Sequence, residues 1–398
     1  LQIDGNGAQQ SSANPDAVGI FITGADFNVT IEHTFLHDGL NGNLHIRMPG
    51  GTGPIGHTAR VLDNIVGKSY SSADSTDDLW VSSMWDTVID GNTVYGAGHI
   101  GIIGGSGGDY AVRISNNYVL QTAAFAGIFE DGAANNFLHD VSIFGNTVIG
   151  NQLGNGIETG ASIRNEVISN NNLNNTLEGI RLLNSQSIVV SGNSVTRSST
   201  QGIEVNNCLD VTITGNSFSS NGRTTGNADI TLDSGSARVS ISSNTIWSID
   251  AKEYGIWVDS GQTVSNVTIS GNTISHTKEA MRILGGSRYS VTGNMIVMNT
   301  VAGIHIGDSS NILDSVSVMN NIVSGPSPGT FLGSNYVIVG NIGINPVGVL
   351  SSAFSTATLN GVYNVGLCVT CSGTITSART YIIDGYNLLF YISPNAGG

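Results

Sequence analysis

A short phrase recurs along most of this sequence, and its period limits the folds that the chain can adopt. Its plainest copies are ISNNNL, VSGNSV and ITGNSF, between residues 168 and 218. A period of 20 to 30 residues is typical of solenoid proteins, in which each repeat buries its apolar face only against its neighbours. The central position of the phrase falls at Thr34, Asn64, Asn92, Asn117, Asn146, Asn171, Asn193, Asn216, Asn244, Asn272, Asn294, Asn321 and Asn341.

A second phrase, Gly-Ile-x-apolar, alternates with the first and predicts strands. It is clearest at Gly156-Ile157, Gly179-Ile180 and Gly202-Ile203, and related pairs run from residue 19 to residue 304. Leucine-rich repeats have a similar period, but they need an LxxLxLxxN/CxL phrase and usually a helical segment, which these repeats lack. The sequence therefore predicts an all-β parallel β-helix of about 12–13 rungs. Its Asn positions are expected to form an internal ladder, because Asn tolerates left-handed backbone and its amide can hydrogen-bond from rung to rung.

These two phrases, together with IDGNG at residues 3–7, resemble the pectate-lyase-like family of right-handed parallel β-helix proteins. The resemblance covers about residues 1–345. Members include polysaccharide lyases, glycoside hydrolases, epimerases, phage tailspikes and adhesins, so the resemblance implies an architecture and several functions. It implies a right-handed helix and an extracellular or virion-surface location.

The phrase stops after Asn341, and the rest of the chain has a different pattern. Residues 346–398 contain alternating strand-like runs such as YNVGLCVTC, and they predict a small antiparallel β-unit over the open end of the stack. The unit is similar to terminal modules that trimerise tailspike-like proteins, so a homotrimer is one expectation. Cys368 and Cys371 form either a local disulfide or two thiols. At the other end, Leu1 is expected to begin a processed or trimmed chain whose cap was lost or is replaced by a partner.

Charge and hydropathy narrow the classes of partner. The net charge is −15, with only three Lys, which argues against nucleic acid or an anionic membrane as a partner. No apolar run approaches the ~18 residues that a membrane-spanning helix needs. A polysaccharide or surface glycan is therefore the expected partner, and an acidic polysaccharide is not excluded, since a local cationic patch can bind it.

Strand alternation divides the second phrase into inward and outward positions. The Ile and the second apolar residue point inward, and the residues between them form an outward stripe. Aromatic rings on the stripe suit sugar rings, because they bury a large area at a low entropy cost. The candidate substrate-binding residues of the stripe are Trp80, Phe129, Trp257, Asp259, Arg282 and His305.

Acidic residues meet in the middle of the stripe around one arginine. The candidate catalytic residues are Asp131, Glu158, Arg181, Glu204 and Asp233. Glu158 and Glu204 are two rungs apart, roughly 9–10 Å between backbones, and Glu204 and Asp233 lie one rung apart on a diagonal. Carboxyl separations of ~5–5.5 Å suit retaining and ~6.5–9.5 Å suit inverting glycoside hydrolysis, so either pair fits.

Three interpretations of the acidic stripe remain open. In a hydrolase, Glu158, Glu204 and Asp233 supply the acid and base, and Arg181 orients the substrate. In a lyase, the family resemblance implies a Lys or Arg base, and because the stripe has no Lys, this base would be Arg181 or Arg282. In a non-catalytic structural or adhesive β-helix, the same residues form a charge ladder that contributes under ~1 kcal/mol per exposed pair.

Several other polar residues need an explanation. Glu130 falls at an inward position, so either a bulge turns it outward or it is buried and paired. The spacing of His33, His37, Asp38, His45 and His57 fixes no zinc site. No cofactor is required by the sequence, but Ca²⁺ is permitted, since Asp74, Asp77 and Asp78 offer hard oxygen ligands and family members often use this ion.

Overall fold

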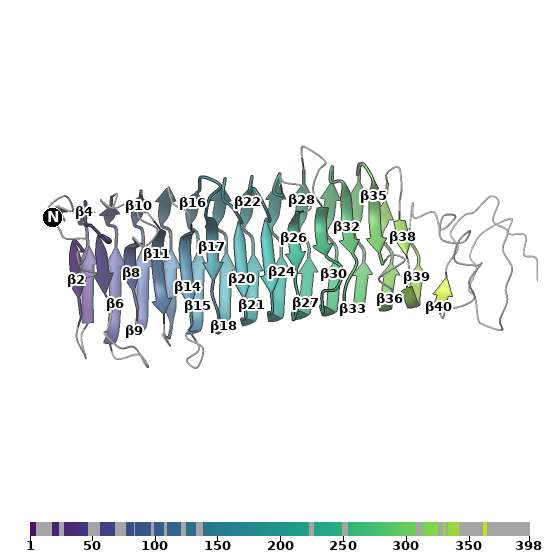
Figure 1. Ribbon diagram of the computed structural model, residues 1–398, viewed down its shortest axis with the longest axis horizontal. Helices are drawn as coiled ribbons and strands as arrows, with labels where there is room; N and C mark the ends of the chain where they lie inside the picture. The colour runs from purple at the N-terminus through teal and green to yellow at the C-terminus, as the bar shows by residue number, and fades with distance from the viewer. Residues whose placement is uncertain are drawn as a thin grey trace, which may run out of the picture.

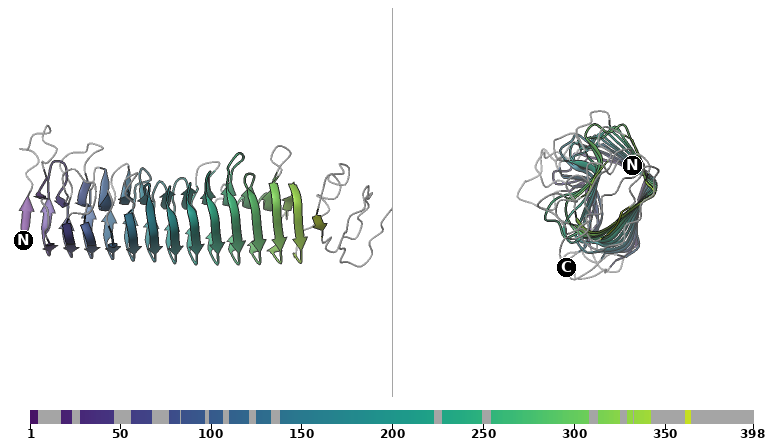
Figure 2. Two further views of the ribbon diagram at one scale, coloured as in Figure 1. Left: turned by 90° about the horizontal axis from the view of Figure 1, so that it is seen from below. Right: turned by 90° about the vertical axis from the view of Figure 1, so that its right-hand side faces the viewer.

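The structure, a computed structural model, is an elongated stack of short parallel strands (Figure 1). Seen along its axis, three sheets enclose a single interior (Figure 2). Within the described residues, no helix is long and apolar enough to cross a membrane. The structure describes residues 1–4, 18–23, 28–46, 56–67, 77–82, 84–96, 99–106, 110–120, 125–132, 138–222, 227–248, 254–307, 313–324, 329–331, 333–341 and 361–363.

Sheet A contains the strands that follow the ladder Asn of each repeat. They are two or three residues long, and most carry a single buried residue between two turn segments. The 13 strands are β1 (Gln2–Asp4), β4 (Phe35–His37), β7 (Ile65–Val66), β10 (Thr93–Tyr95), β13 (Tyr118–Leu120), β16 (Thr147–Ile149), β19 (Asn172–Asn174), β22 (Ser194–Thr196), β25 (Ser217–Ser219), β28 (Thr245–Trp247), β31 (Thr273–Ser275), β34 (Met295–Val297) and β37 (Ile322–Val323).

Sheet B contains the Gly-Ile-x-apolar phrases and therefore the predicted stripe. All of its neighbouring strands pair in parallel. The 13 strands are β2 (Ile20–Ile22), β5 (Leu44–Ile46), β8 (Asp77–Val81), β11 (Ile100–Ser106), β14 (Ala126–Asp131), β17 (Asn155–Thr159), β20 (Ile180–Leu183), β23 (Ile203–Asn206), β26 (Ala228–Leu232), β29 (Tyr254–Val258), β32 (Glu279–Ile283), β35 (Ala302–Ile306) and β38 (Gly329–Phe331).

Sheet C contains longer strands that end just before the ladder Asn. Its 14 strands are β3 (Asn28–Glu32), β6 (Gly56–Leu62), β9 (Met84–Asp90), β12 (Val112–Ser115), β15 (Leu138–Phe144), β18 (Ile163–Ser169), β21 (Gln186–Ser191), β24 (Leu209–Thr214), β27 (Ala237–Ser242), β30 (Ser265–Ser270), β33 (Ser287–Thr292), β36 (Leu313–Met319), β39 (Gly333–Val339) and β40 (Gly361–Tyr363). The three sheets confirm the predicted parallel β-helix and its number of rungs. Apart from β40, which pairs in parallel with β39, the unit predicted at 346–398 lies outside the described residues.

The predicted Asn ladder is present and runs from Asn64 to Asn341. At each rung the backbone N–H and the side-chain Nδ2 of one Asn both donate to Oδ1 of the next. For Asn171 and Asn193 these distances are 2.9 and 3.0 Å, and Asn193 repeats them with Asn216. The Nδ2 of Asn193 also donates to the Ile168 carbonyl oxygen at 2.9 Å. The ladder thus satisfies buried backbone groups where the chain turns between sheets C and A.

The residue before each ladder Asn has left-handed backbone, which explains why the phrase reads Gly-Asn or Asn-Asn. Gly192 and Gly215 have φ of 65° and 64°, and Asn116 and Asn170 both have φ of 54°. Glycine adopts this region without a steric cost, and Asn tolerates it better than most residues.

The interior is one continuous apolar core. The phrase residues Ile157, Ile180, Ile203 and Ile230 lie on successive rungs and have no exposed surface. Each stacks on its equivalents above and below, so no single rung could bury its apolar face alone. The core therefore holds the strands of sheet B in a fixed register, and this register positions the stripe.

Candidate functional site

The outward residues of sheet B form one column, in the register that the repeat predicted. Strand pairing aligns Phe129 with Glu158, Glu158 with Arg181, and Arg181 with Glu204. The column continues through Thr231, Trp257, Arg282 and His305. We call the residues from Phe129 to His305 in this alignment the sheet B column.

The middle of this column is more buried than an ordinary outward face. Glu158 is 4% exposed and Glu204 is 7% exposed, although strand alternation predicted that both would face water. Asn155, at the start of β17, contacts Glu158, and Glu178, in the turn before β20, contacts Arg181. The exposed charge ladder considered from the sequence is therefore a sheltered charge cluster, in which interactions are stronger than at the surface.

Arg181 lies at the centre of this cluster and contacts three carboxylates. Its Nε lies 3.0 Å from Glu204 Oε2 and 3.5 Å from Glu178 Oε2, and its Nη1 lies 3.7 Å from Glu158 Oε1. Only the contact with Glu204 has hydrogen-bond geometry. On the far side, Asn155 Nδ2 donates to Glu158 Oε2 at 2.6 Å. One guanidinium thus links carboxylates from three successive rungs.

Glu178, Glu204 and Asp233 form a chain of carboxyl groups, with Glu204 in the middle. Burial, followed by the nearby charge of Glu204, raises the pKa of Glu178 to about 8. Burial, followed by a hydrogen bond with Glu204, raises the pKa of Asp233 to about 7. Carboxyl groups this close cannot all ionise at neutral pH, so the chain retains protons there.

The remaining catalytic candidates have distinct surroundings. Burial raises the pKa of Glu158, against the opposing effects of Asn155 and Arg181. Asp131 Oδ1 accepts the Ala161 backbone N–H at 2.9 Å, and burial raises its pKa. Asp131 is therefore held by the backbone beside the cluster.

Glu178 was missed in the sequence analysis. It lies just before the Gly-Ile pair, in a turn whose direction strand alternation does not describe. The sequence does contain a pattern that could have identified Glu178, because EGIR at 178–181 and EAMR at 279–282 occupy equivalent places in two repeats. An acidic residue three positions before an outward Arg, repeated at the same register, indicates an ion pair between the two side chains.

The second copy of this pattern builds a different cluster. Glu279 contacts Arg282 Nη1 at 2.8 Å and His305 Nδ1 at 3.1 Å. Burial opposes ionisation of Glu279, but the bond with His305 and the charge of Arg282 outweigh it and lower its pKa. The Tyr254 ring lies 5.3 Å from the Arg282 guanidinium and 5.6 Å from the Trp257 ring.

Asp259 lies beside these residues, just after β29. Its Oδ1 accepts the Ser260 backbone N–H at 2.8 Å, and its charge contributes to the raised pKa of Asp233. The substrate-binding candidates Trp257, Asp259, Arg282 and His305 are therefore gathered on one side of the Arg181 cluster.

The aromatic candidates Phe129 and Trp80 lie on the other side. Phe129 packs edge-on against Phe125, which stacks on His99, and His99 Nδ1 lies 3.0 Å from Asp77. Trp80 packs against His45 at 5.4 Å. Among the residues that the structure describes, no group of three His, Cys, Asp or Glu could hold a metal ion. Asp74 and the His57 side chain lie outside the described part.

Glu130 is buried and points inward, and the bulge lies on the neighbouring strand. The register of β11 against β14 shifts between Ile103 and Gly105, and this frees the Gly104 N–H to donate to Glu130 Oε1 at 3.0 Å. A Cβ on Gly104 would lie 2.4 Å from that oxygen. The inward carboxylate thus belongs to the core beside the sheet B column.

Comparison with known proteins supports the architecture. Residues 78–246 match the family model described as the right handed beta helix region. The catalytic unit of a thermostable GH87 alpha-1,3-glucanase from Streptomyces thermodiastaticus strain HF3-3 superposes with a TM-score of 0.51 and 14% identity, over 84% of this chain and 64% of that chain. No curated protein matches the sequence.

Two further structures are similar at lower scores. Tailspike protein 2 of the Escherichia coli O157:H7 bacteriophage CAB120 has a TM-score of 0.40 and 14% identity, over 62% of this chain and 39% of that chain. The A-module of the Azotobacter vinelandii mannuronan C-5 epimerase AlgE4 has a TM-score of 0.42 and 11% identity, over 78% and 91%. The chain thus spans less than two thirds of the glucanase and the tailspike. The three-sheet parallel stack shows that the chain folds as a parallel β-helix, and residues 78–246 within it resemble the right-handed β-helix family.

Proposed function

We propose that this protein binds a polysaccharide or surface glycan along the sheet B column and hydrolyses it at the Arg181 cluster. The observation that carries the proposal is the pairing of Asp233, whose pKa is raised to about 7, with Glu204, which is ion-paired to Arg181. A carboxyl group that keeps its proton near neutral pH, as Asp233 does, is what a general acid for hydrolysis of a glycosidic bond requires.

The cluster suggests a division of roles. Asp233, hydrogen-bonded to Glu204, would protonate the leaving oxygen. Glu158 contacts a different nitrogen of Arg181 and would activate a water. Glu204 and Asp233 lie within hydrogen-bond reach, which is closer than the ~5 Å of a retaining pair. The proposed acid Asp233 and base Glu158 lie three rungs apart, roughly 14 Å between backbones by strand spacing, so their side chains must converge towards Arg181 to reach the ~6.5–9.5 Å of an inverting pair.

The charge of the cluster favours a neutral substrate. Four acidic residues, Glu158, Glu178, Glu204 and Asp233, surround the single cation Arg181. A uronic acid would add a further carboxylate to this acidic cluster. Arg181 already pairs with carboxylates of the protein, so it is not free to neutralise the carboxylate of a uronic acid, as the lyase alternative requires. Phe129 and Trp257, on either side of the cluster, would stack on sugar rings.

Product release tests this proposal. The protein is incubated with a panel of neutral and acidic polysaccharides, and reducing ends are measured, together with absorbance near 235 nm for lyase products. Asp233→Asn and Glu158→Gln should each lose at least ~100-fold of the turnover, as removal of a general acid or base does, while thermal melting shows that both variants are folded. Asp210→Asn, on the exposed face of sheet C, is the control. Full turnover in both site variants would place the chemistry elsewhere.

A non-catalytic adhesive or structural role is the second candidate. It is favoured by the Glu279–Arg282–His305 cluster, which repeats the ion-pair pattern without a raised carboxyl pKa. Binding of a glycan without product from any polysaccharide in the panel would establish this alternative. An extracellular or virion-surface location and a homotrimer remain proposals under either function, and sedimentation of the full chain tests the latter.

A further inference from the structure

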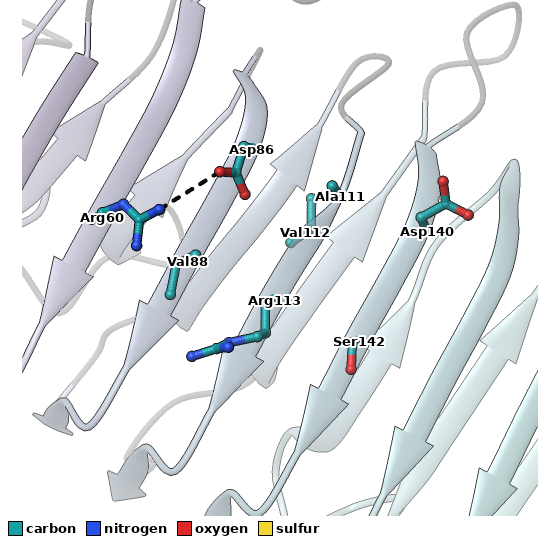
Figure 3. Close-up of a pocket in the computed structure, with 8 residues that line it drawn as sticks. All are labelled: Arg60, Asp86, Val88, Ala111, Val112, Arg113, Asp140 and Ser142. Atoms are coloured by element: carbon teal, nitrogen blue, oxygen red, sulfur yellow. Dashed lines mark ion pairs between the residues drawn. The ribbon is translucent and has the colours of Figure 1, made fainter.

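The outer face of sheet C carries a pocket that is separate from the sheet B column (Figure 3). Its volume is about 390 Å³, and strands β6, β9, β12 and β15 form its floor and walls. Sites for small molecules usually measure ~300–1,000 Å³. The size is therefore sufficient for a ligand, and its chemistry depends on the lining side chains.

Charged residues alternate around this pocket. Strand pairing places Arg60, Val88 and Arg113 in one column, so the two Arg residues are separated by an apolar residue. The neighbouring column carries Asp86 and Asp140 (Figure 3). The lining thus has two cations and two anions around an apolar floor, and its formal charge is zero.

The charged side chains of the pocket make few ion pairs and hydrogen bonds with other residues of the protein. Arg60 Nη2 lies 3.9 Å from Asp86 Oδ2, which is at the long limit of an ion pair. Arg113 is exposed and lies 5.8 Å from the Phe144 ring centroid, and none of the described carboxylates lies within ion-pair distance of it. Asp140 Oδ1 accepts one bond from Asn165 at 3.1 Å. Donors and acceptors therefore remain available on opposite sides.

A small residue, Ala111, keeps the pocket open. Ala111 and Asp140 belong to a series of left-handed residues that continues along sheet C, with φ between 54° and 60°. Larger side chains occupy equivalent places further along, at Arg238 and Arg288. The fold can thus accept a long side chain at this position, and the pocket is open here because the residue is Ala111.

A row of stacked rings occupies the positions next to three pocket residues along the chain. Trp85 stacks on Tyr110 at 4.9 Å, and Tyr110 stacks on His139 at 5.0 Å. Each precedes a pocket position in the chain. Trp85 is 48% exposed and Tyr110 is 36% exposed, so the row presents adjacent aromatic surface to solvent, and contiguous apolar surface is typical of a binding site.

We propose that this pocket is a second glycan-binding site, which takes a neutral sugar unit. Sugar hydroxyls both donate and accept, so they suit alternating Asp and Arg residues, and the apolar C–H face of a ring suits Val88 and Ala111. An anionic ligand would meet Asp86 and Asp140. Binding at this site does not depend on catalysis at the Arg181 cluster, so it can be tested independently of the proposed hydrolysis.

Saturation-transfer NMR and calorimetry on the full chain test the site. The probes are cellotetraose, laminaritetraose, maltotetraose and mannotetraose, with tetragalacturonate as the acidic comparison. Arg113→Ala removes one set of donors, and Ala111→Arg fills the pocket with a residue that the fold carries elsewhere. Arg288→Ala, another exposed Arg of sheet C, is the matched control.

At least one neutral tetrasaccharide should bind, and both pocket variants should weaken its binding about tenfold or more, as loss of a charged hydrogen bond does. Arg288→Ala should leave binding unchanged. The proposal is overturned if no neutral probe binds, if only tetragalacturonate binds, or if Ala111→Arg and Arg113→Ala bind as well as the unmodified chain while thermal melting shows that all are folded.

Discussion

Arg181 Nε donates to Glu204 Oε2 at 3.0 Å, and this bond joins adjacent rungs at the centre of the sheet B column. The two residues are 23 positions apart, and they meet because the apolar residues of their phrases stack in register. Glu204 also contacts the carboxyl groups of Glu178 and Asp233. The architecture of the repeat therefore brings one cation and several acids together in a partly buried place.

Arg181→Gln should destabilise the protein more at pH 8 than at pH 5. The charge of Arg181 lowers the pKa of Glu158, Glu178 and Asp233. At pH 8 more of these groups are ionised and would lose their counter-charge, whereas at pH 5 most of the raised groups are protonated. We expect a loss of about 2–3 kcal/mol at pH 8 and under about 1 kcal/mol at pH 5. Urea unfolding at both values measures this.

Arg238→Gln is the control for this change, because Arg238 forms an exposed ion pair with Asp210 on sheet C. Its substitution should have little effect at either pH. Equal losses for Arg181→Gln at pH 5 and pH 8 would contradict the account of shared protons in the cluster.

The rate of glycan hydrolysis should fall as the pH rises through about 7. Asp233 has its pKa raised from 3.8 to about 7, so the protonated acid is present below that value and is lost above it. In the unmodified protein the charge of Arg181 lowers the pKa of Asp233, so loss of that charge would raise this pKa further. Arg181→Lys keeps the charge, and the pH profile of its kcat should therefore still fall near pH 7. A rate that is flat between pH 6 and 9 would exclude Asp233 as the acid.

Glu166→Gln should stabilise the protein at pH 8 and have much less effect at pH 4. Glu166 points into the core from β18, has no exposed surface, and neither carboxyl oxygen has a hydrogen-bond partner among the described residues. Burial raises its pKa from 4.5 to about 8. A raised folded pKa contributes stability that is complete below pH 4.5 and is lost as the pH rises towards 8.

The resulting difference for Glu166→Gln is on the order of 3–5 kcal/mol between those limits. Denaturant midpoints at pH 4, 6 and 8 measure it. Glu32→Gln, an exposed carboxyl of β3, is the matched control and should not alter the pH dependence. Parallel curves for Glu166→Gln and the unmodified chain would mean that water reaches this carboxyl.

The sequence was sufficient for the fold and for the sheet B column, because both follow from stacking of repeated apolar positions. The repeat alone therefore places Glu158, Arg181 and Glu204 in one column. The burial of Glu158 could not be predicted, since it depends on how the side chains of Asn155 and Arg181 pack against it, and strand alternation gives only the face on which each residue lies. The sheet C pocket was not predicted from the sequence either. The small size of Ala111 becomes informative only when it is compared with the larger residues at equivalent positions of sheet C.

Asn193→Ala should destabilise the stack strongly, although it removes only one amide. Asn193 Oδ1 accepts from the backbone and the side chain of Asn171, and its Nδ2 donates to Ile168 and Asn216. Truncation leaves a buried N–H and a buried carbonyl without partners, and each such group costs ~1–3 kcal/mol. We expect a loss of about 2–4 kcal/mol in the free energy of unfolding. Asn172→Ala, an exposed neighbour on β19, should change it by less than about 0.5 kcal/mol, and similar losses for both variants would mean that the ladder contributes no more than an exposed amide.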